Sequence, residues 1–331
     1  MGRLLAFLSL VAGCTQTPEP TSPASTSPEP DDPWRTSAAA YLDARVADWL
    51  AAPPQVANVE CAMSCHTTFP AVLVHAHLPA ETTPNIDEAR ARFEARLSGD
   101  VTPFYGRDGD AKVQQSHATE AVLVAAALRY DGVPRPSSAP ALERMWARQS
   151  PQGDWAWLDF GLEPWEHDGA FGVAMAALAA SGETESDGLQ RLRKRADTLA
   201  TAANLHDRAA LLWASSRLEG LLNDAQAEAI ATELRAVQRS DGGVALASLL
   251  GDDQPTEPDG YATAWVALSL CSSGQAPDAA RAAQRWLRAH QAPDGSWPGR
   301  SVNGSSRTAK QYMTDAATAY AVLALDCASE R

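Results

Sequence analysis

Two cysteines and a histidine lie close together in the segment ECAMSCHTTFP, residues 60–70. Cys61 and Cys65 have three residues between them, and His66 follows the second cysteine directly. Two thiols can bond to the vinyl groups of a haem while an adjacent imidazole reaches the iron; the usual pattern places two residues between the thiols. The sequence therefore predicts covalent haem c on Cys61 and Cys65, with His66 as an axial iron ligand. A short-loop disulfide between the two cysteines is the alternative.

The N-terminal residues predict export. Residues 1–13 place Arg3 before a short apolar run and small residues, which is the pattern of a signal peptide. The ending VAGC resembles the lipobox of bacterial lipoproteins, so we expect an acylated Cys14. Residues 14–33 are rich in Pro, Ser and Thr and are predicted to form a disordered tether. We therefore expect an exported, lipid-anchored protein on the outer membrane, facing the periplasm.

Residues 34–331 are expected to form one all-α domain, because amphipathic segments alternate with segments that are apolar on all sides. An amphipathic helix covers a core, and a helix that is apolar all round lies inside one. The alternation predicts an (α/α)6 toroid, in which six helical hairpins form an inner and an outer ring. An open α-solenoid is the alternative. About twelve helical segments are expected; examples of the amphipathic kind are 186–203, 223–238 and 277–291, and examples of the apolar kind are 119–130, 169–182, 261–271 and 314–328.

Charge and the remaining cysteines restrict the partners. The formal net charge is −14, which argues against nucleic acid because an acidic surface repels the phosphate backbone. Cys271 and Cys327 lie in apolar runs, and we interpret both as small buried hydrophobic residues.

Three turns share a pattern of glutamine, glycine and a large apolar residue. Glycine permits the positive φ that ends a helix, and the glutamine can bond to exposed backbone at a neighbouring helix end. The turns are QSPQGDW at 149–155, QRSDGGV at 238–244 and QAPDGSW at 291–297. They resemble the QW repeats of the squalene–hopene cyclase and prenyltransferase superfamily. Val244 stands where the other two turns have tryptophan, so that repeat is degenerate.

Longer stretches resemble a bacterial exported family that joins a squalene-cyclase-like toroid to an N-terminal C-x-x-C-H motif. The stretches are AAAYLDARVADWL, SCHTTFP, TEAVL, GDWAWLDFGLEPWE, LLWAS, DGYATAW, HQAPDGSWPGRSVNG and MTDAATAYAVLAL. They cover nearly the whole chain after the tether. The resemblance implies the toroid and the haem, although the extra residue between Cys61 and Cys65 departs from the family's pattern.

The two best-known reactions of the superfamily lack their residues in this chain. Class II cyclases protonate their substrate with a desolvated aspartate of a D-x-D-D motif, and the sequence has no D-x-D-D. Protein prenyltransferases bind zinc through Asp, Cys and His. Here Asp259 is followed by Tyr261 where the cysteine is needed, and Tyr312, Met313 and Asp315 of the last inner helix come without a histidine. We expect neither reaction and no zinc site of that type.

Polar residues are expected at the beginnings of the inner helices, which a toroid gathers at one mouth above an apolar barrel. For any single residue helix capping is the simpler explanation, but together they predict a binding site for an apolar or polycyclic, isoprenoid-like molecule. The expected pocket residues are His117, Glu120, Glu166, Asp259, Tyr261 and Asp315. The candidate catalytic carboxylates are Glu120, Asp159, Glu166, Asp168, Asp207, Asp259 and Asp315. A second axial iron ligand is expected from His117, His167, His206 or Met313.

The sequence leaves the function open between two main classes. The first is an exported redox protein with covalent haem, a redox partner and an apolar ligand, active in electron transfer or oxidation. The second is a haem-free binding or structural toroid with a Cys61–Cys65 disulfide. A terpene cyclase or an acid-dependent lyase-like enzyme is a further alternative.

Overall fold

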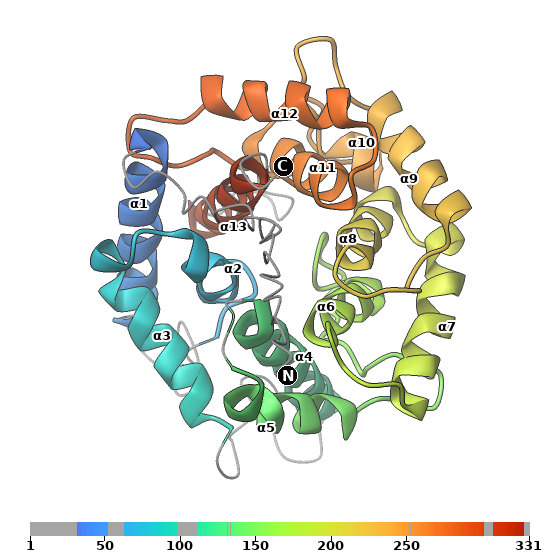
Figure 1. Ribbon diagram of the computed structural model, residues 1–331. Coiled ribbons are helices and arrows are strands. Elements are labelled where there is room, and N and C mark those ends of the chain that lie inside the picture. Colours follow the sequence, from blue (N-terminus) through green and yellow to red (C-terminus); the bar gives the residue numbers. More distant parts are fainter. Residues whose placement is uncertain are drawn as a thin grey trace, which may run out of the picture. The chain divides into compact units, whose positions relative to one another are not determined.

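Six helices of the described chain form an inner ring (Figure 1). They are α2 (Thr68–Val74), α4 (Ala111–Tyr130), α6 (Ala170–Ala179), α8 (Leu205–Ser215), α11 (Gly260–Ser273) and α13 (Arg307–Asp326). Each packs against the next in this order, and α13 packs against α2, so the ring closes. The computed structural model describes residues 32–51, 63–97, 111–130, 132, 134–251, 253–300 and 307–327.

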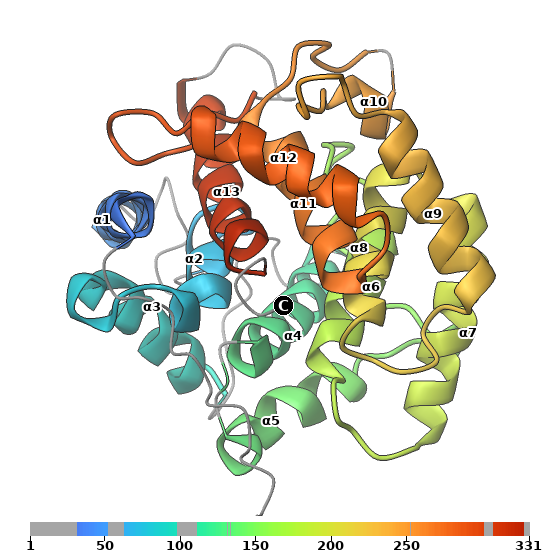
Figure 2. The same ribbon diagram turned by 45° about the horizontal axis from the view of Figure 1, so that its top comes forward.

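A second set of helices packs outside the first. The outer helices are α1 (Pro33–Leu50), α3 (Pro84–Ala95), α5 (Arg135–Trp146), α7 (Asp187–Ala202), α9 (Asp224–Ala236) and α12 (Pro277–Ala289). Figure 2 shows α7, α9 and α12 on the outside of α6, α8 and α11. Inner and outer helices alternate along the chain, with the short α10 (Ala247–Leu250) between α9 and α11. The predicted all-α (α/α)6 toroid is therefore confirmed, and the open solenoid is wrong.

Local sequence explains why the helices begin where they do. Ser186 Oγ accepts a hydrogen bond from the Leu189 amide at the start of α7, and Asn223 forms a capping box with Gln226 at the start of α9. The inner helices contain long apolar runs, and every residue of α6 is buried. Helices of this kind are stable only when a second layer surrounds them, which the outer ring provides.

The three repeated turns connect neighbouring outer helices, as the sequence predicts. Gln291 Nε2 donates to the Gly295 carbonyl of its own turn at 2.9 Å and to the Trp34 carbonyl of α1 at 2.8 Å. Gln149 and Gln238 make the corresponding pairs of bonds towards α7 and α12. Gly295 has φ +87°, and a Cβ there would lie 2.2 Å from the Ser37 carbonyl oxygen, so only glycine fits. The third turn thus joins α12, the last outer helix, to α1, the first outer helix.

A disulfide between Cys271 and Cys327 corrects the interpretation of these residues as independent hydrophobic side chains. Cys271 lies in the last turn of α11 and Cys327 directly follows α13, and their Cα atoms are 6.2 Å apart. The two residues are 56 positions apart in sequence. They meet because α11 and α13 are neighbours in the inner ring.

Several sequence-based predictions lie outside the described residues. These are the signal peptide at residues 1–13, the lipid on Cys14, the tether as far as residue 31, and Cys61. Within the described residues, α1 begins at Pro33, next to the expected start of the domain. None of the described helices combines the length and apolarity that a membrane span needs.

Candidate functional site

All six inner helices begin at the same mouth of the ring. At this end Thr67, which precedes α2, donates to Asp315 of α13 at 2.8 Å, and Tyr261 of α11 lies 2.7 Å from His206 of α8. We call this end the N-terminal mouth, formed by residues 64–68, 163–168, 204–207, 259–261 and 312–315. Helix N-termini carry partial positive charge and attract carboxylates, which explains why acids gather here.

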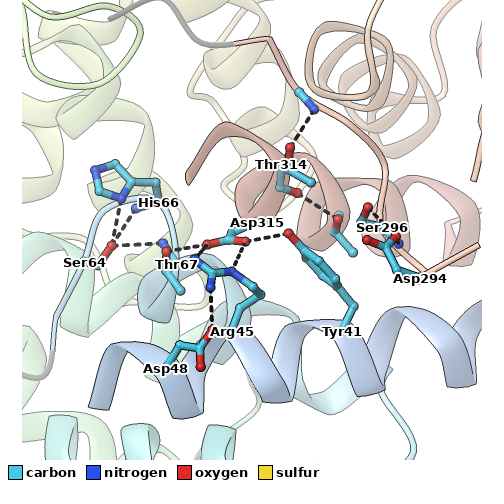
Figure 3. A network of polar contacts seen from close by, with 12 residues as sticks. Tyr41, Arg45, Asp48, Ser64, His66, Thr67, Asp294, Ser296, Thr314 and Asp315 are labelled. Carbon is cyan, nitrogen blue, oxygen red and sulfur yellow. Dashed lines mark hydrogen bonds and ion pairs between the residues drawn. The ribbon is translucent and has the colours of Figure 1, made fainter. Parts of the chain in front are cut away.

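Asp315 joins three elements at the N-terminal mouth (Figure 3). Its carboxylate accepts hydrogen bonds from Tyr41 at 2.8 Å, from Arg45 Nε at 2.9 Å and from Thr67 at 2.8 Å. Burial raises the pKa of Asp315, although Arg45 and Thr67 stabilise its charged form. Because both carboxylate oxygens are already bonded, Asp315 acts as a clamp between α1, α13 and the segment before α2.

His66 lies beside this clamp in a setting suited to a metal ligand. Its Nδ1 shares a hydrogen bond of 2.8 Å with the Ser64 hydroxyl (Figure 3), and its ring stacks on Tyr312 with centroids 4.3 Å apart. Burial lowers the pKa of His66 to about 4, so the imidazole is neutral at pH 7. A hydrogen bond at Nδ1 would make Nε2 the coordinating atom if His66 bound a metal. The buried Cys65 side chain bonds to Glu166, and Cys61 lies outside the described residues.

A chain of buried polar groups links Tyr261 to Asp207. The Tyr261 hydroxyl lies 2.7 Å from His206 Nε2, and His206 Nδ1 lies 3.0 Å from Asp207 Oδ1. All three side chains are fully buried. A carboxylate can only accept, so His206 donates from Nδ1 and accepts the tyrosine proton at Nε2. Burial raises the pKa of Tyr261 well above its usual value, so the phenol keeps its proton at neutral pH.

A second group of acids surrounds His167 in the loop between α5 and α6, residues 147–169. His167 Nε2 lies 3.2 Å from Glu163 Oε1, 3.6 Å from Asp168 Oδ2 and 4.0 Å from Asp207 Oδ2. One ligand atom each from His167, Asp168 and Asp207 lies within 4.8 Å of the others, a spacing at which a metal ion could bind. The same loop holds Trp165 against Tyr261, with ring centroids 5.3 Å apart.

Asp259 caps α11 rather than facing open space. It accepts from the Ala262 amide at 2.8 Å and from the Arg300 amide at 2.9 Å. Burial raises the pKa of Asp259 to about 6 despite these bonds. Glu166 is also partly buried, and burial raises its pKa.

Three of the predicted site residues lie elsewhere. The expected start of an inner helix at Thr119 is wrong, because α4 begins at Ala111 and Glu120 falls near its middle. Glu120 forms a buried ion pair with Arg96, at 2.6 Å and 2.8 Å, between α4 and the outer layer. His117 has its pKa lowered by burial and by Arg148. Asp159 is exposed, and its carboxylate accepts from the Gly161 amide.

The opposite end of the ring, which the sequence analysis did not single out, contains a cavity of about 220 Å³. Its lining comes from the ends of the inner helices: His77, Tyr130, Trp213, Ser216, Arg217, Leu268, Ser272, Leu323 and Cys327. We call this end the C-terminal mouth. His77 Nδ1 bonds Asp326 at 2.5 Å, and the Arg217 guanidinium lies 4.6 Å from the centre of the Tyr130 ring. The sequence carries little signal for this mouth, because among the six inner helices only α4 has a basic residue, Arg129, in its last turn.

Comparison with known proteins supports the fold. No family model and no curated protein matches the chain. An unsaturated glucuronyl hydrolase specific for heparin aligns with a TM-score of 0.59 and 12% identity, covering 91% of this chain and 98% of its own. A possible GH105 member from Klebsiella pneumoniae aligns at 0.56 and 12%, covering 96% and 99%. The type II terpene cyclase MstE from Scytonema aligns at 0.49 and 17%, covering 88% and 99%.

Proposed function

We propose that the protein is an exported toroid that binds haem c at its N-terminal mouth and works in electron transfer or oxidation. The observation that carries the proposal is the setting of His66. Its Nδ1 is bonded to Ser64, and its low pKa keeps the ring neutral, so Nε2 can bind iron. Cys65 lies next to it on the motif, and Cys61 would supply the second thioether.

The disulfide between Cys271 and Cys327 supports the proposed location. Disulfides form and persist in oxidising compartments and are rare in the cytosol. Attachment of haem c and acylation of Cys14 both belong outside the cytoplasm. We therefore propose that the chain faces the periplasm from the outer membrane, held by the lipid on Cys14.

The chain's own residues would determine how the haem behaves. A bound haem supplies one-electron exchange at its iron. The hydrogen bond from Ser64 orients His66, and Tyr312 packs on one face of the imidazole. The ring centroid of Trp165, on the α5–α6 loop, lies 5.8 Å from that of His66. His206 bonds at both ring nitrogens, so it is the least suitable of the expected second ligands.

Aromatic side chains decide where an apolar ligand would lie. Tyr261, Trp265, Trp213 and Tyr320 are fully buried and contact one another between the inner helices. Their rings occupy space in the interior of the barrel. We therefore propose that an apolar or polycyclic molecule, and the redox partner, meet the protein at the N-terminal mouth.

Absorption spectra of the protein matured in a host with c-type cytochrome assembly test the proposal. We expect a Soret band that stays with the polypeptide after denaturation. Cys61→Ser with Cys65→Ser should abolish covalent haem, and His66→Ala should shift the band while haem stays attached. Ser64→Ala is the matched variant, which should keep the haem but alter the iron's ligand field. Wild-type protein without haem, with Cys61 and Cys65 joined in a disulfide, would overturn it.

A second candidate is an acid–base enzyme of the hydrolase or lyase type. The hydrogen-bonded series Tyr261–His206–Asp207 favours this candidate. A carboxylate that orients a histidine prepares the imidazole to accept a proton. Toroids of this shape include the glucuronyl hydrolase named above. Turnover of unsaturated glucuronyl disaccharides, lost in Tyr261→Phe and His206→Gln, would support this candidate, and its absence would remove it.

A further inference from the structure

The cluster around His167 has the donor set and spacing of a metal site. Glu163, His167 and Asp168 come from the α5–α6 loop, and Asp207 comes from the first turn of α8. Ligand atoms placed about 2.1 Å from one tetrahedral ion lie roughly 3.4 Å from one another, and those of His167, Asp168 and Asp207 all lie within 4.8 Å of one another. The distances from His167 Nε2 to the three carboxylates, 3.2, 3.6 and 4.0 Å, fall around that value.

Asp207 gives an independent reason to look for a cation. Its side chain is fully buried, and its Oδ1 is occupied by His206. Its Oδ2 is directed towards His167 Nε2 and has no hydrogen-bond partner among the described residues. A buried carboxylate oxygen without a partner costs a large desolvation energy. Glu163 Oε2, beside the same histidine, is also buried and has no hydrogen-bond partner among the described residues.

Hydrogen bonding at His167 points to a lone pair on Nε2. Asn204 Oδ1 accepts from the Asp207 amide at 2.9 Å, which turns its amide nitrogen to His167 Nε2 at 3.2 Å. An amide nitrogen only donates, so Nε2 is an acceptor in this arrangement and cannot also donate to the carboxylates. A lone pair facing three carboxylates is repulsive, and a cation between them turns every contact into an attraction.

We propose that His167, Asp168 and Asp207 bind one divalent transition-metal ion of the zinc or manganese class, with the Glu163 carboxylate beside His167. Imidazole suits zinc, while carboxylates suit manganese, and a mixed set of one nitrogen and several oxygens fits either. These residues differ from the Asp–Cys–His set of the prenyltransferases. The ion would tie the α5–α6 loop to α8, and so hold Trp165 over Tyr261 at the N-terminal mouth.

Equilibrium dialysis of the full-length protein with Zn²⁺ and with Mn²⁺ at pH 7, read by elemental analysis, tests the site. We expect one bound ion per chain and weaker binding of Mg²⁺. His167→Gln and Asp207→Asn should each weaken binding by more than about 100-fold. Asp159→Asn is the matched control, because it removes the same charge from the same loop outside the cluster and should bind as wild type does.

Two further variants protect the test against misfolding and against confusion with haem. Asp168→Asn changes a half-exposed side chain and keeps the oxygen that accepts from the Ala170 amide, so it should fold and still lose affinity. Cys61→Ser with Cys65→Ser cannot hold covalent haem and should bind the ion unchanged. No saturable binding by the wild type, or equal binding by His167→Gln and Asp207→Asn, would overturn the proposal.

Discussion

The two mouths of the ring differ in charge, burial and the way they are fastened. The N-terminal mouth collects acids, and burial raises the pKa of Asp259, Asp315 and Glu166 there. At the C-terminal mouth burial alone would raise the pKa of Asp326, but hydrogen bonds from His77 and Arg35 hold it at about 2. Parallel inner helices favour acids at the N-terminal mouth through their dipoles, whereas Asp326 at the other end is stabilised by His77 and Arg35.

The fastening of each mouth follows the same division. At the C-terminal mouth a disulfide between Cys271 and Cys327 joins α11 to the end of α13. At the N-terminal mouth the hydrogen bonds of Asp315 join α13 to α1 and to the segment before α2. Carboxylates whose pKa is raised by burial are candidates for acid–base chemistry, which supports the proposal that a ligand binds at the N-terminal mouth. The C-terminal mouth combines a cavity with a carboxylate, Asp326, whose charged form His77 and Arg35 stabilise.

The largest expected effect is on the C-terminal fastening. Replacing Cys271 and Cys327 by serine should lower the free energy of unfolding by about 4 kcal/mol, since the bond closes a loop between residues 56 positions apart. Urea unfolding of the variant and of the oxidised wild type measures the difference. Equal midpoints would mean that the disulfide does not stabilise this end.

Removing the N-terminal fastening should have a slightly smaller effect. Asp315→Ala leaves Arg45, Tyr41 and Thr67 without their shared acceptor, which should cost about 3 kcal/mol of unfolding free energy. Asp48→Ala is the control, because Asp48 is the exposed partner of the same arginine and should change stability by less than about 1 kcal/mol. Similar losses in both variants would show that Asp315 is not a clamp.

Opposite pH dependences should separate the two mouths. The pKa of Asp259 is higher in the folded state than the ordinary value of about 3.9, so the folded chain binds its proton more tightly and loses stability as the pH rises from 4 to 6. The pKa of Asp326 is lower when folded, so its contribution is present above pH 4 and is lost as the pH falls towards 2.

Two asparagine variants measure this contrast by urea unfolding against pH. As the pH rises from 4 to 6, the unfolding free energy of Asp259→Asn should increase by about 2 kcal/mol relative to that of the wild type. As the pH rises from 2 to 4, the unfolding free energy of Asp326→Asn should decrease by about 2 kcal/mol relative to that of the wild type. Differences of the same sign would contradict the assignment of the two carboxyl groups to unlike environments.

The toroid was predictable because its signals are local and repeated. Helical periodicity separates inner from outer helices, and each turn with glutamine and glycine marks the same point of a hairpin. The Cys271–Cys327 bond was not predictable, because pairing requires knowing that α11 and α13 are neighbours. Glu120 was misplaced for a related reason: α4 extends to Ala111 through the polar run AKVQQSHA, which hides its start.

The cluster around His167 was beyond sequence reasoning for a different reason. Loop residues 147–169 have no periodicity from which a conformation follows. The sequence named His167 as a possible axial iron ligand and Asp168 and Asp207 as candidate catalytic carboxylates, but not as one cluster. Their approach to Asp207 depends on α6 and α8 being adjacent inner helices, and Glu163 reaches them only through the path of the loop.

The smallest expected effect concerns the charge at the C-terminal mouth. Arg217 follows the end of α8 by two residues, and its guanidinium lies 4.6 Å from the Tyr130 ring centre. Arg217→Gln therefore removes a cation–π contact and a positive charge just beyond a helix C-terminus. The expected cost is about 1 kcal/mol of unfolding free energy, and less in high salt because the dipole term is screened. Arg217→Lys is the control, since it keeps the charge and should recover part of the loss. Equal stability of all three proteins at low salt would show that the basic character of this mouth does not stabilise the ring, and would leave its cavity as the feature to explain.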